Sequence, residues 1–167
     1  MKKLLFIAIL AGAAWWYFVG GRSITEAQVN DFYRATEAAT LARKPDDLCN
    51  LLAEDFTSSG TVALGGQRRA QSQSKSQVCE GYVALYEAWD KLGEKMGGTL
   101  QLDSTYEIHS IEVAPDKKTA KVDISSSLDV AGSLTNIRSR STDTLVRRGG
   151  KVLLLRSEGT ASVGAGS

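Results

Sequence analysis

The sequence predicts an α+β domain in which N-terminal helices pack on a strongly curved antiparallel sheet, preceded by one transmembrane helix. Three observations lead to this fold class. Between residues 23 and 96 most apolar residues recur at helical spacing, whereas after Gly98 they alternate with a period of two. Runs of helices followed by runs of strands are typical of domains whose helices cover one sheet face. An uncharged apolar run at the N-terminus predicts the membrane segment.

The apolar run covers residues 4–21. As an α-helix it would be roughly 27 Å long, close to the thickness of a bilayer core. Lys2 and Lys3 precede the run, so we expect the N-terminus to stay in the cytoplasm while the rest crosses the membrane. We therefore predict a single-pass protein of the bacterial inner membrane, with residues 1–21 as signal anchor and residues 22–167 as a periplasmic domain.

A cleaved signal peptide is the alternative to an anchor. The small residues at 11–13 (Ala-Gly-Ala) and at 19–21 (Val-Gly-Gly) both resemble cleavage sites. The aromatic cluster at residues 15–18 favours the anchor, because such side chains gather at the membrane–water interface. The sequence leaves both interpretations open.

The composition excludes several classes of protein. Lys and Arg number 20 and Asp and Glu number 19, so the net charge of +1 argues against a nucleic-acid binder with a basic surface. Two cysteines and one histidine cannot supply a zinc site of the usual four-ligand kind. The sequence contains no phosphate-binding loop, dinucleotide fingerprint or zinc-protease motif. We therefore expect no cofactor, no metal ion and no nucleic acid.

The two cysteines are Cys49 and Cys79. In an oxidising compartment such as the periplasm, a lone pair of thiols is expected to form a disulfide. If the domain stayed in the cytoplasm, the same residues would be two buried free thiols. Because the N-terminus predicts export, we predict the disulfide.

The first two helices follow from capping and spacing. Ser23 and Glu26 fit a capping box, and the helix that they begin is expected to reach about Arg43. Pro45 suits the first turn of a second helix, and acidic residues follow it. One apolar face of this second helix is formed by Leu48, Leu51, Leu52 and Phe56.

The segment after the second helix is expected to hold a short strand and a loop. Residues 57–64 are rich in Thr and Val, which favour a strand. Residues 67–77 are polar and lack periodicity, so we predict an exposed loop. Its Arg68, Arg69 and Lys75 could meet an acidic partner, although a solvated loop is the simpler interpretation.

The third helix has the clearest pattern, and Gly97 and Gly98 end it. Its apolar residues lie at alternating intervals of four and three, which predicts one continuous apolar face. The residues of this face are Val78, Tyr82, Leu85, Trp89, Leu92 and Met96.

Long strands follow Gly98. The first, over residues 100–113, changes its parity near Ser110, which predicts a bulge there. The others are expected at residues 120–130, 134–148 and 152–163. Strands of this length twist and curl. We therefore expect a cone, with a pocket between helices and sheet.

This order of elements resembles the nuclear transport factor 2-like superfamily, which includes the ketosteroid isomerases. The resemblance covers roughly residues 24–163 and also rests on the stretch from Leu48 to Ser59, in the context DLCNLLAEDFTSSG. A membrane anchor followed by such a domain also resembles, in architecture alone, the periplasmic assembly domains of type IV secretion systems. The first resemblance implies a cone-shaped fold and an interior pocket.

The resemblance suggests which residues face that pocket. Ketosteroid isomerases use a carboxylate base together with a tyrosine and an acid. Tyr33 matches the pocket tyrosine, and alternation allows Asp143 to face inward. Ser126 interrupts an inward apolar face and predicts a polar group in the pocket. Three aromatic residues of the third helix either line the pocket or form plain core: Tyr82, Tyr86 and Trp89.

Residues 58–64, where the isomerase base would lie, contain no carboxylate. We therefore predict no catalytic residues and a membrane-tethered, exported domain that mediates protein interaction or assembly in the cell envelope. Its partner would be another envelope protein or a second copy of the chain. The alternative is a small-molecule-binding domain, or an isomerase- or dehydratase-like enzyme, that holds a small apolar ligand in the cone.

Overall fold

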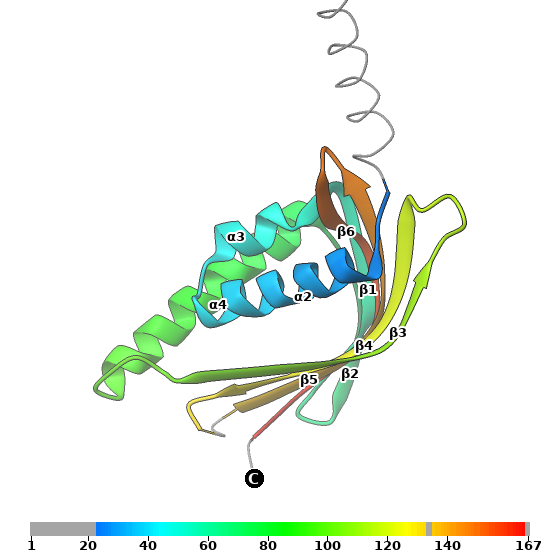
Figure 1. The fold of residues 1–167 in the computed structure, drawn as a ribbon. Helices are drawn as coiled ribbons and strands as arrows, with labels where there is room; N and C mark the ends of the chain where they lie inside the picture. Colours follow the sequence, from blue (N-terminus) through cyan, green and yellow to red (C-terminus); the bar gives the residue numbers. More distant parts are fainter. Residues whose placement is uncertain (1–22, 133–134, 166–167) are drawn as a thin grey trace, which may run out of the picture.

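The computed structural model describes residues 23–132 and 135–165 of the chain. The predicted membrane segment, residues 1–21, lies outside this part. Among the described residues, no helix is long and apolar enough to cross a membrane. Figure 1 shows the helices gathered on one side of a sheet whose strands bend around them.

The helices are α2 (Glu26–Leu41), α3 (Pro45–Asn50) and α4 (Lys75–Lys95). Helix α2 begins later than predicted, because Thr25 and Gln28 form the capping box that we assigned to Ser23 and Glu26. Helix α3 is shorter than predicted. Leu52 and Phe56 belong to the next strand, where both are buried.

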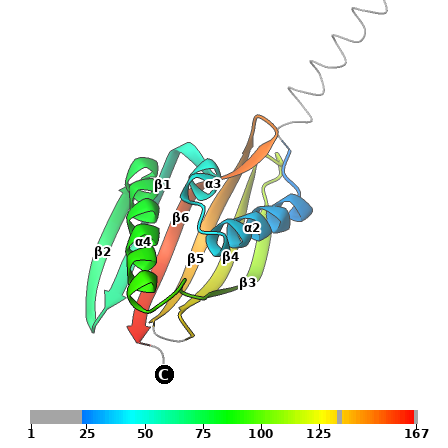
Figure 2. The same ribbon diagram turned by 90° about the vertical axis from the view of Figure 1, so that its left-hand side faces the viewer.

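One six-stranded sheet forms the other layer. Its order is β2-β1-β6-β5-β4-β3, which can be followed across Figure 2. The strands are β1 (Leu52–Leu64), β2 (Gln67–Ser74), β3 (Leu102–Val113), β4 (Thr119–Val130), β5 (Thr135–Arg148) and β6 (Lys151–Ala165). Two predictions were wrong. Residues 67–74 form an edge strand rather than a loop, and β1 pairs parallel with β6, so the sheet is mixed.

The predicted curvature has visible local causes. The register shifts between Ile108 and Ser110 where β3 meets β4, which confirms the predicted bulge. A second shift lies between Thr144 and Leu145 on β5. Gly60 on β1 and Gly159 on β6 are register partners, and a Cβ atom on either would meet neighbouring backbone. Bulges and close backbone contact together let the strands bend around the helices.

Two hydrophobic clusters hold the helices on the inner face of the sheet. The first joins α2 to one end of the sheet through Val29, Phe32, Tyr33, Val122, Ile124 and Leu145, among others. The second joins α4 to the other end through Tyr86, Trp89, Leu100 and Val130. Ser126 and Ser139 lie between Ile124 of the first cluster and Leu128 of the second, so the middle of the inner face is polar.

Helix α4 presents a different face from the predicted one. Its buried residues are Tyr86, Trp89 and Gly93, whereas Leu85, Leu92 and Met96 are 37%, 38% and 58% exposed. Gly93 lies on this buried side, close to the turn that ends the helix. A Cβ atom there would lie 2.5 Å from the carbonyl oxygen of Gly98. The helix therefore turns its glycine, rather than its leucines, toward the chain that follows.

The predicted disulfide is confirmed. Cys49 on α3 and Cys79 on α4 are bonded, with their Cα atoms 5.6 Å apart. The bond joins α3 to α4, whose Leu48, Tyr86 and Trp89 also share one hydrophobic cluster. It therefore fixes the position of α4 relative to the rest of the helical layer.

Candidate functional site

The interior polar site is built around Asp143 of β5, which is 6% exposed. Its register partners are Val122 on β4 and Ser157 on β6, and its contact with Tyr33 places it under helix α2. The Tyr33 hydroxyl donates a hydrogen bond of 2.9 Å to Asp143 Oδ2. The Ser157 hydroxyl donates a bond of 2.7 Å to Asp143 Oδ1. Both carboxyl oxygens are therefore occupied by groups of the protein itself.

Burial dominates the acid–base behaviour of this pair. It raises the pKa of Asp143 above the ordinary value of 3.8, although hydrogen bonds from Ser157, Tyr33 and Ser141 oppose the shift. Burial and the adjacent Asp143 also raise the pKa of Tyr33. Tyr33 therefore stays a hydrogen-bond donor throughout the physiological pH range, and Asp143 is its acceptor.

The other residues of the predicted pocket lie apart from this pair. The rings of Tyr86 and Trp89 pack edge to face with their centroids 5.5 Å apart. The Tyr86 hydroxyl donates a hydrogen bond to the carbonyl oxygen of Thr40. Burial, with smaller effects of Tyr86 and Asp143, raises the pKa of Tyr82 to about 12. The Ser126 hydroxyl is 2.7 Å from that of Ser139. The structure brings Tyr33 and Asp143 together; that all six residues form one ligand pocket stays a prediction.

The pH dependence of stability should report the buried carboxyl. Its pKa is raised in the folded protein, so the folded chain keeps a proton that the unfolded chain releases. The free energy of unfolding should therefore fall as pH rises from about 3.8 through the raised folded value, and stay lower above it. Urea titrations of Asp143→Asn between pH 4 and 8 should show a flatter profile than those of the parent. An unchanged profile would contradict this assignment.

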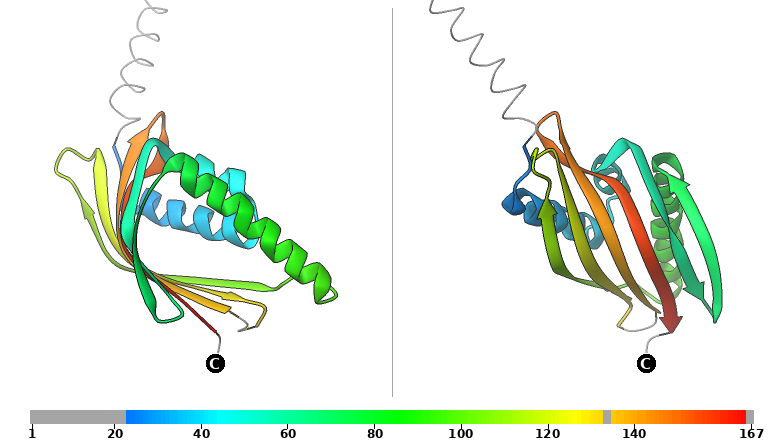
Figure 3. Two further views of the ribbon diagram at one scale, coloured as in Figure 1. Left: turned by 180° about the vertical axis from the view of Figure 1, so that it is seen from behind. Right: turned by 90° about the vertical axis from the view of Figure 1, so that its right-hand side faces the viewer.

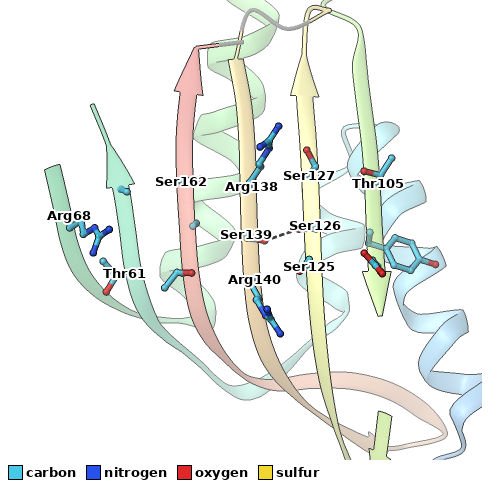
Figure 4. Close-up of a pocket in the computed structure, with 15 residues that line it drawn as sticks. Thr61, Arg68, Thr105, Ser125, Ser126, Ser127, Arg138, Ser139, Arg140 and Ser162 are labelled. Carbon is cyan, nitrogen blue, oxygen red and sulfur yellow. Dashed lines mark hydrogen bonds between the residues drawn. The ribbon is translucent and has the colours of Figure 1, made fainter. Parts of the chain in front are cut away.

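A larger cavity, of about 850 Å³, lies on the sheet face that points away from the helices. Figure 3 shows that none of the described helices, α2, α3 and α4, covers this outer face, and Figure 4 shows the cavity in close-up. We call it the outer trough. Its floor consists mainly of two rows of side chains that cross the sheet. One row contains Arg68, Ala63, Ser162, Arg138, Ser127 and Thr105 in register; the other contains Thr61, Thr160, Arg140, Ser125 and Glu107.

The charges in the outer trough are unevenly compensated. Arg140 forms a 2.9 Å ion pair with Asp123, and this contact raises the pKa of Arg140 and lowers that of Asp123. Among the residues that the structure describes, Arg68 and Arg138 have neither an ion pair nor a side-chain hydrogen bond. The small side chains of Ala63 and Ser162 separate them. The trough therefore offers two available guanidinium groups above a polar floor.

Comparison with solved structures gives the fold. The chain is similar to a ketosteroid isomerase-like protein from Erwinia carotovora atroseptica, with a TM-score of 0.53 and 18% identity over 84% of this chain and 98% of that one. It is also similar to a nuclear transport factor 2-like protein from Cytophaga hutchinsonii, with a TM-score of 0.55 and 12% identity over 83% and 99%. The chain has the nuclear transport factor 2-like fold. No family model and no curated protein sequence matches it.

The sequence could indicate some of the site residues of this fold and not others. Alternation predicts that Asp143 faces inward, because it has the same strand parity as Ile137 and Leu145. The outer trough was missed, since its arginines come from β2 and β5 and only the strand register brings them into one row. Within the described residues, no group of three or more His, Cys, Asp or Glu side chains could hold a metal ion.

Proposed function

We propose that this chain is a membrane-tethered, exported, non-catalytic domain that binds another envelope protein through the outer face of its sheet. The observation that best supports this proposal is the outer trough. It is a wide cavity that the described helices leave open, with available guanidinium and hydroxyl groups. Interfaces of this kind combine polar complementarity with a broad, shaped surface.

The tether follows from the sequence. Residues 4–21 are apolar and long enough to span a bilayer, and the lysines before them orient the chain. The disulfide between Cys49 and Cys79 suits an oxidising compartment outside the cytoplasm. The described chain begins, in dark blue, at the upper end of the domain in Figure 1, whereas the outer trough lies on the sheet face, so a tether would leave the trough accessible.

The interior offers less support for catalysis. The Tyr33 hydroxyl donates to Asp143, so the two groups best suited to act on a ligand bond to each other. Both side chains are 6% exposed. The strand segment from Ser58 to Leu64 supplies no carboxylate that could serve as a base. These groups are better explained as a satisfied polar contact that locks α2 onto β5.

One observation favours the second candidate, a small-molecule-binding domain or an isomerase- or dehydratase-like enzyme. Titratable groups with shifted pKa values gather at functional sites, and Asp143 is such a group inside the cone. The serines between the two hydrophobic clusters would supply further polar contacts to a ligand. This candidate predicts that Tyr33→Phe and Asp143→Asn abolish the cellular role, whereas a domain that binds an envelope protein through its outer face should retain it.

Site-specific cross-linking in intact cells tests the proposed function. A photoreactive amino acid at Ser162 lies in the outer trough, and one at the exposed Glu87 lies on α4. We expect a single envelope protein, identified by mass spectrometry, to be cross-linked from Ser162 and not from Glu87. The same partner should be captured from Ser127, at the other side of Arg138 in the same row. Equal capture of unrelated proteins from all positions would contradict the proposal.

A further inference from the structure

We propose that the outer trough binds an extended acidic segment of the partner protein, with carboxylates four residues apart seated on Arg68 and Arg138. This inference deepens the proposed function and rests on it. It assigns the chemistry of the partner, which the proposed function leaves open.

The spacing of the two arginines sets the spacing of the acids. Arg68 on β2 aligns with Ala63, Ser162 and then Arg138, so three strand intervals separate the two arginines. At about 4.8 Å per interval, their backbone positions are about 14 Å apart. An extended peptide rises about 3.4 Å per residue, so four residues cover the same distance. Residues i and i+4 of such a peptide also point to the same side.

The floor between the arginines suits a peptide backbone. Ala63 and Ser162 are small, and the adjacent row adds Thr61 and Thr160. Small side chains leave room for a chain to lie across the strands, and their hydroxyls can pair with its amide and carbonyl groups. The whole row crosses five strand intervals, or about 24 Å, which matches an extended segment of about seven residues.

The charge pattern favours an acidic peptide over other anionic partners. Arg140 is neutralised by Asp123, and Glu107 closes one end of its row, so the basic surface is confined to two points. A nucleic acid would need a continuous basic groove and aromatic side chains for stacking.

Peptide binding to the full-length protein in zwitterionic nanodiscs tests the inference. The probe is the capped heptapeptide Ser-Glu-Ser-Ser-Ser-Glu-Ser, and its isomer Ser-Glu-Ser-Ser-Glu-Ser-Ser moves the second acid to the opposite side. Saturation-transfer NMR gives the apparent Kd of each. We expect the isomer to bind about threefold more weakly, because it loses one exposed ion pair. The double variant Arg68→Gln/Arg138→Gln should weaken binding of the first peptide about tenfold.

Arg69→Gln is the matched control. It removes the same charge one residue along β2, where alternation directs the side chain to the other face. Its Kd should equal that of the parent, and all variants should unfold at the parent's urea midpoint. Equal affinity for the two isomers, or an effect of Arg69→Gln as large as that of the double variant, would overturn the inference.

Two further outcomes also overturn it. One is stronger binding of a linear oligogalacturonate than of the peptide, lost with the same arginines. The other is a homodimer in solution that Arg138→Glu dissociates, since a second copy would then cover the trough. If the peptides fail to bind while cross-linking from Ser162 still captures one envelope protein, the acidic segment is wrong and the proposed function stands. If that capture fails as well, both are wrong.

Discussion

Removing the disulfide should lower the free energy of unfolding by about 3–4 kcal/mol. The bond between Cys49 and Cys79 closes a loop with a sequence separation of 30 residues. In the chain-entropy model, a cross-link of that length restricts the unfolded ensemble by this amount. Urea unfolding of the oxidised protein and of Cys49→Ala/Cys79→Ala should give midpoints that differ accordingly. The oxidised protein measured with and without a thiol reductant should show the same difference.

The disulfide experiment has an internal control. Ser76 lies on α4 near Cys79 and is exposed, so Ser76→Ala changes a neighbouring side chain without opening the loop. The urea midpoint of Ser76→Ala should therefore fall on reduction as the parent's does. It should become insensitive to reductant only when both cysteines are also replaced. If reduction leaves the parent's midpoint unchanged, the bond contributes nothing to stability and this account of the helical layer is wrong.

Gly159→Ala should destabilise the protein by about 3 kcal/mol, at the upper end of the cost of overpacking. A Cβ atom at Gly159 would lie 2.7 Å from the Cα atom of Ser141 and closer still to the carbonyl oxygen of Arg140. Both contacts are with backbone, so β5 and β6 must move apart at the bend. Because Gly60 is the register partner of Gly159 on β1, the disturbance also reaches the parallel pair. Chemical denaturation measures the loss.

Gly81→Ala is the control for this substitution. Gly81 lies within α4, and nothing lies within 4 Å of a Cβ atom there. Alanine should therefore stabilise the helix by about 1 kcal/mol, through helix propensity. Opposite signs for the two glycines would support close backbone packing as the cause of the bend. Tolerance of alanine at Gly159 would show that the strands do not need this close approach.

The strands after Gly98 were predictable because one face of each is buried. Their alternation reflects contact with the helices, and the parity change near Ser110 marks a real bulge. Strand β2 gave no such signal. All but one of its residues are exposed, so its sequence carries no alternation and only backbone pairing with β1 defines it. An edge strand of this kind cannot be distinguished from a polar loop by its side chains.

The orientation of α4 shows a second limit of the sequence. Apolar spacing predicts a helix and one buried face, but two adjacent faces carried apolar residues. The buried face contains Gly93, where a Cβ atom would meet the carbonyl oxygen of Gly98 in the turn that ends the helix. The spacing of apolar residues alone does not choose between two adjacent faces. The result buries Tyr86 and Trp89 and leaves Leu92 and Met96 exposed.

The two candidate sites differ in the same way. Tyr33 and Asp143 could be predicted, because each lies on the inward side of an element with clear periodicity. Their mutual hydrogen bond requires the packing of α2 over β5, which alternation alone does not give. The outer trough depends wholly on register. Arg68 and Arg138 are 70 positions apart in the sequence and become members of one row only through three strand pairings.

Recovery of the cross-linked partner after changes at each site is the most direct test of the proposed function. The photoreactive residue stays at Ser162, and two variants are compared: Tyr33→Phe/Asp143→Asn in the interior and Arg138→Glu in the outer trough. The account predicts that the interior variant captures the partner as the parent does, whereas Arg138→Glu captures at most a tenth as much. Loss of capture in the interior variant, with full capture by Arg138→Glu, would contradict the proposed function and favour a role for the interior site around Tyr33 and Asp143.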